Sequence, residues 1–475
     1  MLSGKHYNQV SPAIAGELSS IVGDANVIYG DAGKLSRYSR DQVANPKYGH
    51  PPEIVVFATD ADQVSLIMKL ANRSMIPVTP RGGGSGLSGG AVPLFGGIAL
   101  ALDRMTQVKE IDTQNLVAVV EPGVITKELD RQLAASGLFF AGYPLSEEIC
   151  TVGGNVAENA GGGRAVKYGV TSRYVLGLEV VLPSGEVMSL GGKRYKDVTG
   201  YDLIHLLTGS EGTLGVFTEI TLRLLPRPTK RAVLSAWFGD DAAAVDLVPS
   251  LLASPSVLPS AIEFLDRTCL EVTEKYVGGT ADVSKPPLLL IEIDGNDSGD
   301  LERRLASAAS ICTKAGAEIS VASTDEEQER LWKIRKQVPW ALKKMNPQLT
   351  AEDIVVPVGR LAEILSDIRS IEKKYGIAIP CFGHAADGNI HASPMKGDQI
   401  SDEQWDDVLH SVLVDVYACT SEVGGTISGE HGIGHKRKSY LPQVMDSSQI
   451  SLLKALKRSI DPNLVLNPGK IFDLP

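Results

Sequence analysis

Short apolar runs and helical patterns alternate through the first half of the chain. Four apolar runs predict strands, at residues 53–57, 76–80, 98–102 and 116–120. Apolar residues at helical spacing predict helices at 62–72 and 126–136. A strand at 174–182 enters a hairpin turn at 183–186, and an alternating strand at 216–225 follows. This half therefore reads as short strands separated by helices and glycine-rich loops.

The pattern changes after the Leu-Pro-Arg-Pro stretch that ends at Pro228. Longer strands are predicted at 288–294, 318–322 and 354–358, with helices at 301–315, 326–336 and 361–375. Such an alternation predicts an antiparallel sheet with helices on one face. The end of the chain carries a glycine-rich loop and a helix near 449–458. We therefore expect an α+β protein of three parts, 1–228, 229–425 and 426–475.

Composition narrows the classes of protein that the chain can represent. Its 475 residues are 43% hydrophobic, and a net charge of −11 argues against nucleic acid or an anionic membrane as the main partner. No apolar run approaches the ~18 residues of a membrane span, and the amino terminus lacks the apolar stretch of a signal peptide. The five cysteines form no CxxC pair, which argues against a disulfide framework, a cysteine zinc site and an iron–sulfur cluster. We expect a cytoplasmic protein that reaches a membrane only through a partner.

A run of glycines at residues 81–90 is the most unusual segment of the chain. Residues without a Cβ allow backbone N–H groups to approach a pyrophosphate closely. Gly84, Gly86 and Gly89 satisfy the GxGxxG pattern, but residues 90–97 leave no room for the helix that this dinucleotide motif requires. The segment also lacks the Gly-Lys-Ser/Thr ending of a nucleotide triphosphatase loop. A flexible surface loop is the remaining alternative.

Two further glycine clusters make a surface loop less attractive. One runs from Thr151 through residues 159–163 to Gly169, and the other spans residues 209–216. A solvated linker does not need three such clusters set between strands. Three backbone surfaces that approach one extended cofactor do need them, so we predict such a cofactor.

These three segments resemble the FAD-binding domain of the vanillyl-alcohol-oxidase superfamily, and the likeness runs over nearly the whole chain. The most similar branch contains the glycolate oxidase flavin subunit, D-lactate dehydrogenase and D-2-hydroxyglutarate dehydrogenase. The resemblance implies a two-lobed FAD-binding domain, an antiparallel cap domain and a C-terminal helical segment that returns to the FAD domain. It also implies non-covalent FAD, because the loop contains no histidine for a covalent link. The residues implied to bind FAD are Pro80, Arg81, Gly82, Gly83, Gly84, Ser85, Gly86, Leu87, Pro144, Thr151, Gly153, Gly154, Asn155, Asn159, Gly161, Gly162, Tyr168, Gly169, Glu211, Gly212, Leu214, Gly215, Val216 and Asn467.

Four of the eight histidines lie in two short segments. In the first, the turn residues 387–389 follow an apolar run, which predicts a hairpin that brings His384 and His391 to one end. The residues alone leave open whether this is a structural hairpin or a metal site. In the second segment, Glu430 and His431 are neighbours whose side chains diverge in extended backbone.

The second segment also has two other interpretations. The acid and the imidazole can be solvated side chains on a glycine-rich approach to a helix. Alternatively, His431 and His435 can pair across one helical turn as metal ligands, although Gly432 and Gly434 disfavour a helix.

The resemblance assigns roles to both segments. It implies that His384, His391 and Glu430 bind a divalent metal, and that His431 is the general base. Two imidazoles and a carboxylate leave an open site for the hydroxyl and carboxylate oxygens of a substrate, which therefore lies against His384 and His391. Zinc suits these ligands, and manganese or iron remains an alternative.

Arg335 is our candidate for the substrate carboxylate, since relatives place an arginine at this point and a guanidinium binds carboxylates in a fork. A solvated arginine on a charged helix is the alternative. D-2-Hydroxyglutarate dehydrogenases carry a lysine before the next strand, where this chain reads Thr-Ala-Glu-Asp at 350–353. This departure favours a monoacid such as lactate or glycolate over a dicarboxylic acid.

We therefore expect oxidation of a small D-2-hydroxy acid to its 2-oxo acid, with hydride transfer to FAD. Because the chain lacks a cluster motif, its electrons must pass to a separate acceptor: a quinone, a cytochrome, an electron-transfer flavoprotein or an iron–sulfur protein. A homodimer is compatible with the sequence. The alternatives are a flavoenzyme without net redox that resembles alkylglycerone-phosphate synthase, and a non-catalytic flavin-binding subunit.

Overall fold

The computed structural model describes residues 7–43, 48–278, 287–322 and 324–474. The chain divides into two compact units. Unit 1 comprises 1–161, 170–227 and 430–475, and unit 2 comprises 162–169 and 228–429. The functional division into FAD-binding, cap and returning parts remains a prediction, and part of the amino-terminal stretch considered above lies outside the described residues.

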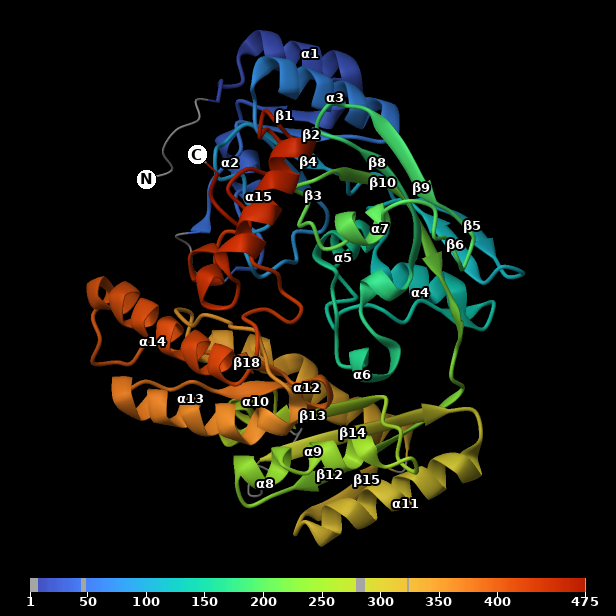
Figure 1. Cartoon of the computed structure of the whole chain (residues 1–475), viewed down its shortest axis with the longest axis vertical. Helices are drawn as coiled ribbons and strands as arrows, with labels where there is room; N and C mark the ends of the chain where they lie inside the picture. Colours follow the sequence, from blue (N-terminus) through green and yellow to red (C-terminus); the bar gives the residue numbers. More distant parts are fainter. Residues whose placement is uncertain (1–6, 44–47, 279–286, 323, 475) are drawn as a thin grey trace. The chain divides into compact units, whose positions relative to one another are not determined.

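The first sheet of unit 1 is buried on both faces. Its strand order is β1 (Val27–Tyr29), β2 (Ile54–Phe57), β4 (Ile98–Ala101) and β3 (Val78–Arg81), with the last three parallel. Helices α1 (Pro12–Val22) and α3 (Ala61–Ser74) lie side by side on one face, where Leu18 and Ile67 join Ile54 in one core cluster (Figure 1). On the other face, Leu35 of α2 (Ala32–Leu35) packs with Phe57. Burial on both faces explains why these strands are continuous apolar runs.

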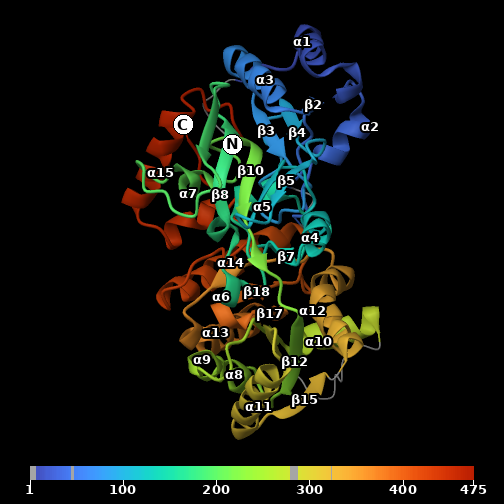
Figure 2. The ribbon, with the colours of Figure 1, turned by 90° about the vertical axis from the view of Figure 1, so that its right-hand side faces the viewer.

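The second sheet of unit 1 is antiparallel. Its order is β5 (Val108–Asp112), β6 (Val117–Val120), β10 (Val216–Arg223), β8 (Val175–Val181) and β9 (Val187–Gly191), as Figure 2 shows from one side. The unit also contains α4 (Thr126–Ala134), α5 (Val152–Glu158), α7 (Leu203–Leu207) and the short pair β7 (Leu138–Phe139) and β11 (Leu225–Pro226). Two sheets with helices confirm the α+β class predicted for this part of the chain.

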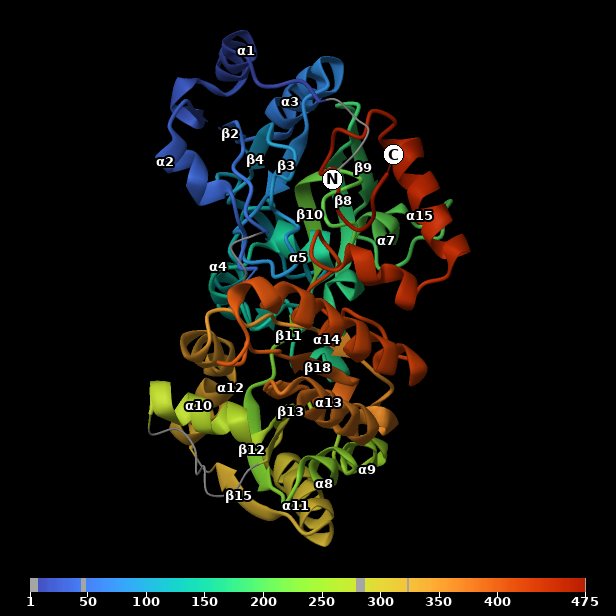
Figure 3. The same cartoon turned by 90° about the vertical axis from the view of Figure 1, so that its left-hand side faces the viewer.

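The C-terminal segment returns to the first sheet of unit 1. Beside β3, the N–H of Val78 donates to Val465 O at 2.8 Å, and the N–H of Asn467 donates to Val78 O at 2.7 Å. Helix α15 (Ser447–Ile460) precedes this pairing (Figure 3). Its buried Lys457 donates to Thr213 O and Leu466 O, each at 2.7 Å, and to Asp461 Oδ2 at 2.6 Å.

Lys457→Ala is expected to destabilise unit 1 by about 3–5 kcal/mol, because it leaves the buried Asp461 carboxylate without its cation. Urea denaturation of the purified protein measures the change in the free energy of unfolding. The control is Arg458→Ala, at an exposed neighbouring position of α15, which should change stability by less than ~0.5 kcal/mol. Equal effects of the two substitutions would show that the buried pair has no special role.

Unit 2 is built on one antiparallel sheet. Its strand order is β15 (Glu318–Ala322), β12 (Lys230–Trp237), β14 (Leu288–Gly295), β13 (Ala261–Leu265), β17 (Cys381–His384), β18 (Asn389–Ala392) and β16 (Ile354–Val355). The helices are α6 (Ala165–Tyr168), α8 (Asp241–Val245), α9 (Val248–Ala253), α10 (Arg267–Val277), α11 (Ser298–Lys314), α12 (Asp325–Met345), α13 (Leu361–Tyr375) and α14 (Asp402–Glu422). Helices α10 and α12 lie side by side in Figure 2, as do α13 and α14 in Figures 1 and 3. The predicted antiparallel sheet is confirmed.

Several helices of unit 2 differ from the prediction, since α6, α8, α9 and α10 were not predicted and two longer helices depart from it further. Helix α12 begins with a capping box of Thr324 and Glu327 and continues past the predicted end, although Pro339 lies inside it. Helix α14 was not predicted, yet its buried Trp405, Leu409 and Val412 follow helical spacing. None of the helices in the described ranges has the length and apolarity needed to cross a membrane.

Candidate functional site

The first glycine segment lies directly after β3 in unit 1. Residues 82–97 contain no helix before β4 begins, which agrees with the rejection of a classical dinucleotide motif. Within the described residues, the backbone N–H groups from Gly83 to Leu87 donate to no protein acceptor. A Cβ placed on Gly86 would meet only Asp41 Oδ2, at 3.5 Å. This backbone segment therefore has N–H donors available and room for a ligand beside it. Both features suit the pyrophosphate of an extended cofactor.

The second glycine segment packs closely against the first. A Cβ on Gly82 would lie 2.3 Å from Thr151 Oγ1, and one on Gly83 would lie 2.3 Å from Ile149 O. Thr151 caps helix α5, since its Oγ1 accepts from the N–H of Gly154 at 3.3 Å. Glycine is thus required at two positions by the neighbouring segment rather than by a turn.

The third glycine segment joins the other two through Asn467. The Nδ2 of Asn467 donates to Gly90 O at 3.0 Å and to Glu211 O at 2.8 Å. The N–H of Glu211 donates to Ala157 O, at the end of α5, at 2.7 Å. The three segments, which lie far apart in the sequence, therefore meet within unit 1, as we expected from their glycine content.

The other predicted cofactor residues are divided between the two units. Those of unit 1 lie in β3, α5 and β10 or in the loops next to them: Pro80, Arg81, Gly84, Ser85, Leu87, Pro144, Gly153, Asn155, Asn159, Gly161, Gly212, Leu214, Gly215 and Val216. Gly162, Tyr168 and Gly169 belong to unit 2. There the hydroxyl of Tyr168 donates to Asp294 Oδ2 at 2.7 Å, so this oxygen already has a protein partner.

Two side chains hold the first loop in place. Arg81 Nη1 donates to Arg40 O at 2.8 Å, and its guanidinium lies 5.6 Å from the Tyr38 ring. Asp41, which the sequence analysis missed, accepts from the N–H of Val43 at 3.0 Å and from the N–H of Gly89 at 2.8 Å. Burial raises the pKa of Asp41, and the two backbone N–H groups oppose this effect.

The histidine hairpin of unit 2 is confirmed. Strands β17 and β18 pair in antiparallel register, with Phe382 opposite His391 and His384 opposite Asn389. The rings of His384 and His391 lie edge to face with their centroids 5.5 Å apart, and both side chains are buried. The turn between the strands contains Gly388 at φ +79°, the conformation that favours glycine.

A buried carboxylate orients His384. Glu263 lies opposite His384 across β13 and β17, and its Oε1 is 2.7 Å from His384 Nδ1. Arg335 Nε donates to Glu263 Oε2 at 2.5 Å, and the guanidinium lies 4.8 Å from the Phe382 ring. Burial raises the pKa of Glu263, but the charges of His384 and Arg335 outweigh it and hold this pKa below its usual value. Because Nδ1 is engaged, His384 presents Nε2 to any ligand.

Asp353 organises the other imidazole. Its Oδ1 accepts from Asn389 Nδ2 at 2.8 Å and lies 3.7 Å from His391 Nδ1. Its Oδ2 accepts from Ser428 Oγ at 2.8 Å and from the N–H of Gly429 at 3.0 Å. Asp353 therefore connects the hairpin to Ser428 and Gly429, the last two residues of unit 2 before Glu430.

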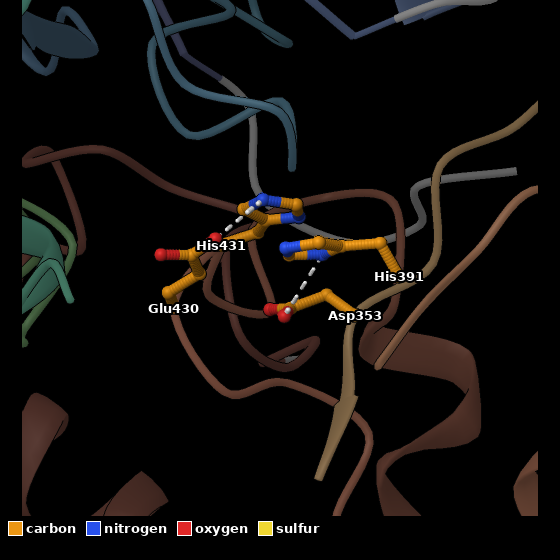
Figure 4. A group of neighbouring side chains, drawn as sticks. All are labelled: Asp353, His391, Glu430 and His431. Carbon is orange, nitrogen blue, oxygen red and sulfur yellow. Dashed lines mark ion pairs between the residues drawn. The ribbon is translucent and has the colours of Figure 1, made fainter. Parts of the chain in front are cut away.

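Glu430 and His431 open the last segment of unit 1. His431 Nε2 lies 3.5 Å from Glu430 Oε1, and both side chains are largely buried (Figure 4). The backbone from His431 to His435 is not helical, so the alternative of a metal pair across one helical turn is not supported. Burial lowers the pKa of His435 to about 4, and its ring packs edge to face against Tyr48.

The donor chemistry of these residues fits a divalent metal. Within unit 2 Asp353 pairs with His391, and within unit 1 Glu430 pairs with His431, so each pair offers a carboxylate and an imidazole as donors (Figure 4). Imidazole nitrogens and carboxylate oxygens are the ligands of zinc and of manganese or iron sites. The sequence analysis missed Asp353 and Glu263. Neither carboxylate lies in a motif, and only strand register brings each to its histidine.

Two regions of the chain match known families. Residues 52–191 match the family described as FAD binding domain, and residues 227–471 match the family described as FAD linked oxidases, C-terminal domain. The chain is 39% identical to the glycolate oxidase subunit GlcD of Bacillus subtilis over 96% of both proteins. It is 36% identical to a D-lactate dehydrogenase of Anaerostipes hadrus over 99% of both. A D-2-hydroxyglutarate dehydrogenase of Stutzerimonas stutzeri is 31% identical, over 97% of this chain and 99% of that protein.

Solved structures share the fold. p-Cresol methylhydroxylase aligns with a TM-score of 0.79 over 97% of this chain and 96% of the other, at 19% identity. Alkyldihydroxyacetonephosphate synthase aligns with a TM-score of 0.75 over 98% and 87% of the two chains, also at 19% identity. At this identity the alignments support the architecture and leave the reaction open.

Proposed function

Because the chain belongs to the FAD-linked oxidases, we propose that it binds FAD non-covalently and oxidises a small D-2-hydroxy acid to the 2-oxo acid. The observation that carries this proposal is a direct connection, within unit 1, between the glycine loop and the segment with His431. Ser88 O accepts from the N–H groups of His435 and Lys436, each at 3.0 Å. A base on this segment is therefore anchored to residues 81–90, part of the proposed FAD-binding surface that we call the flavin bed.

FAD bound by the three glycine segments would supply the acceptor for the hydride of C2 of the substrate. His431 takes the proton of the substrate hydroxyl, a task that suits an imidazole near neutral pH. The two electrons then leave to a separate acceptor, because the five cysteines form no cluster motif. Loss of one hydride and one proton balances the two-electron oxidation of an alcohol to a carbonyl group.

We also propose that His384, His391 and Glu430 hold a divalent ion, with zinc favoured. Such an ion supplies Lewis acidity that lowers the pKa of an alcohol. Two observations support the ligand set. Glu263 fixes the Nδ1 of His384, and Asp353 holds both His391 and the Gly429 peptide to which Glu430 is joined. Glu263 and Asp353 thus orient ligands, a role that buried carboxylates often play around metals.

Arg335 remains our proposal for binding the substrate carboxylate. Its Nε is engaged by Glu263, which would hold the guanidinium in a fixed orientation. The segment before β16 supports a monoacid substrate. Thr350 Oγ1 donates to Glu352 Oε1 at 2.7 Å, and Tyr417 donates to the other oxygen of this buried carboxylate. This segment therefore contributes hydrogen-bonded acidic side chains and no lysine or arginine, so it provides no positive charge for a second substrate carboxylate.

A panel of D- and L-2-hydroxy acids, scored by anaerobic bleaching of the flavin, tests the proposal. D-Lactate or glycolate should reduce the flavin, and D-2-hydroxyglutarate should do so less well. A flavin that no hydroxy acid reduces would favour either a flavoenzyme without net redox or a non-catalytic flavin-binding subunit.

Gly86→Val is expected to weaken FAD binding by at least ~10-fold, because the new side chain would occupy the space left beside the loop. Its Cβ would meet no protein atom closer than 3.5 Å, so the melting temperature of the apoprotein should change little. Fluorescence titration of the apoprotein with FAD measures the affinity. The control is Gly239→Val in unit 2, where a Cβ would have no neighbour within 4 Å. Wild-type affinity of Gly86→Val would remove this loop from the flavin bed.

A further inference from the structure

A buried carboxylate binds the loop that follows His431. Glu211 of unit 1 is only 8% exposed. Its Oε1 accepts from the N–H of Ile433 at 2.9 Å, and its Oε2 accepts from the N–H of Gly434 at 2.6 Å. Two successive peptides are therefore held by the two oxygens of one carboxylate. Hydrogen bonds to an ionised acceptor are roughly twice as strong as those between neutral groups.

The path of this loop depends on glycine at two positions. Gly432 and Gly434 have φ +76° and +53°, and left-handed residues let neighbouring N–H groups converge on an anion. A Cβ on Gly432 would lie 1.7 Å from Glu158 Oε1, and one on Gly434 would lie 2.2 Å from Ser88 O. The loop is thus closely confined by Glu158 and Ser88 as well as by Glu211.

Glu211 is itself fixed by its main chain. Its backbone has φ +52°, an uncommon conformation for a residue with a side chain. Its N–H donates to Ala157 O at 2.7 Å, and its carbonyl accepts from Asn467 Nδ2 at 2.8 Å. On the loop, Gly432 O accepts from Nη1 of the fully buried Arg437 at 3.0 Å. A rigid carboxylate therefore meets a loop that is also anchored from a second direction.

We infer that Glu211 is a positioning residue, which fixes the backbone next to His431 so that the imidazole is held at the flavin. This inference rests on the proposed function for the catalytic role of His431. The carboxylate acts through the Ile433 and Gly434 peptides, and both of its oxygens are used there, so this role of the side chain is separate from the binding of FAD. Misplacing a catalytic group by about 1 Å can cost ~100-fold in rate.

Glu211→Gln in the FAD-loaded enzyme tests the inference. Glutamine has the same size, but its amide nitrogen would face a backbone N–H and cannot accept from it. We expect unchanged FAD content, flavin reduction by D-lactate slowed about 10- to 100-fold, and faster hydrogen exchange in residues 430–437. The control is Glu219→Gln on β10, whose partly exposed carboxylate pairs with Lys109, and it should match the wild type.

A double variant separates positioning from general damage. In the His431→Ala background, Glu211→Gln should slow flavin reduction no further, because the group that it positions is gone. Gly432→Ala offers a second route to the same state, since its Cβ would push the loop away from Glu158. The Gly432→Ala variant should retain FAD, and the substrate should reduce its flavin more slowly than in the wild type.

Four results would overturn the inference. These are a wild-type reduction rate in Glu211→Gln, losses that multiply in the double variant, loss of FAD from Glu211→Gln but not from His431→Ala, and unchanged hydrogen exchange in residues 430–437. The exchange measurement needs no substrate. It therefore judges the anchoring even if no hydroxy acid reduces the wild-type flavin, a result that would reject the proposed function alone.

Discussion

Replacing His431 by alanine is expected to slow anaerobic flavin reduction by D-lactate about 10²- to 10⁴-fold, the usual contribution of a general base. The FAD content should stay at the wild-type level, because we propose that backbone groups of the three glycine segments bind the flavin, and His431 lies in none of them. Stopped-flow absorbance of the flavin measures the rate, and the absorbance before mixing measures the content.

The matched control for this substitution is His205→Ala. His205 is exposed on α7 and pairs with Asp202 Oδ2 at 2.8 Å, so its loss should leave the reduction rate unchanged. A His431→Ala enzyme that reduces its flavin as fast as the wild type would show that another group accepts the proton.

The second large effect concerns the metal. His391→Ala is expected to weaken binding of the divalent ion by at least ~100-fold, since even residues that only orient a ligand contribute 10- to 100-fold. The substitution leaves Asp353 and its bonds to Asn389 and Gly429 in place, so the hairpin should persist. Elemental analysis after dialysis against a chelator measures the bound ion, and added zinc or manganese should restore activity to the wild type but not to the variant.

His410→Ala, at an exposed position of α14, is the control and should retain the ion. If the chelated wild-type enzyme is free of metal and fully active, the His384, His391 and Glu430 ligand set is wrong. The flavin part of the proposal would be unaffected.

Local sequence patterns were sufficient for much of this site. Gly82 and Gly83 mark where the backbone passes close to another segment, and Gly432 and Gly434 also adopt positive φ, which few other residues do. The Asp-Gly-Asn turn at 387–389 predicted the hairpin that aligns His384 with His391. These features depend on neighbours in the chain, and a single sequence contains them.

Contacts between distant segments were not predictable in the same way. Glu263 reaches His384 only because β13 pairs with β17, and the two residues are 121 positions apart. Asp41 and Asp353 look like ordinary acids in the sequence, and Glu211 was predicted only as an FAD-binding residue, yet each binds backbone N–H groups of another segment. Register and tertiary packing decide such contacts, and no local periodicity encodes them.

The most direct test of the account is a single anaerobic turnover of the purified enzyme with D-lactate, with flavin absorbance and 2-oxo acid measured together. The account predicts one 2-oxo acid formed for each FAD bleached, and no bleaching at a comparable rate in His431→Ala. A flavin that stays oxidised with every D-2-hydroxy acid, in an enzyme that retains both FAD and metal, would contradict it.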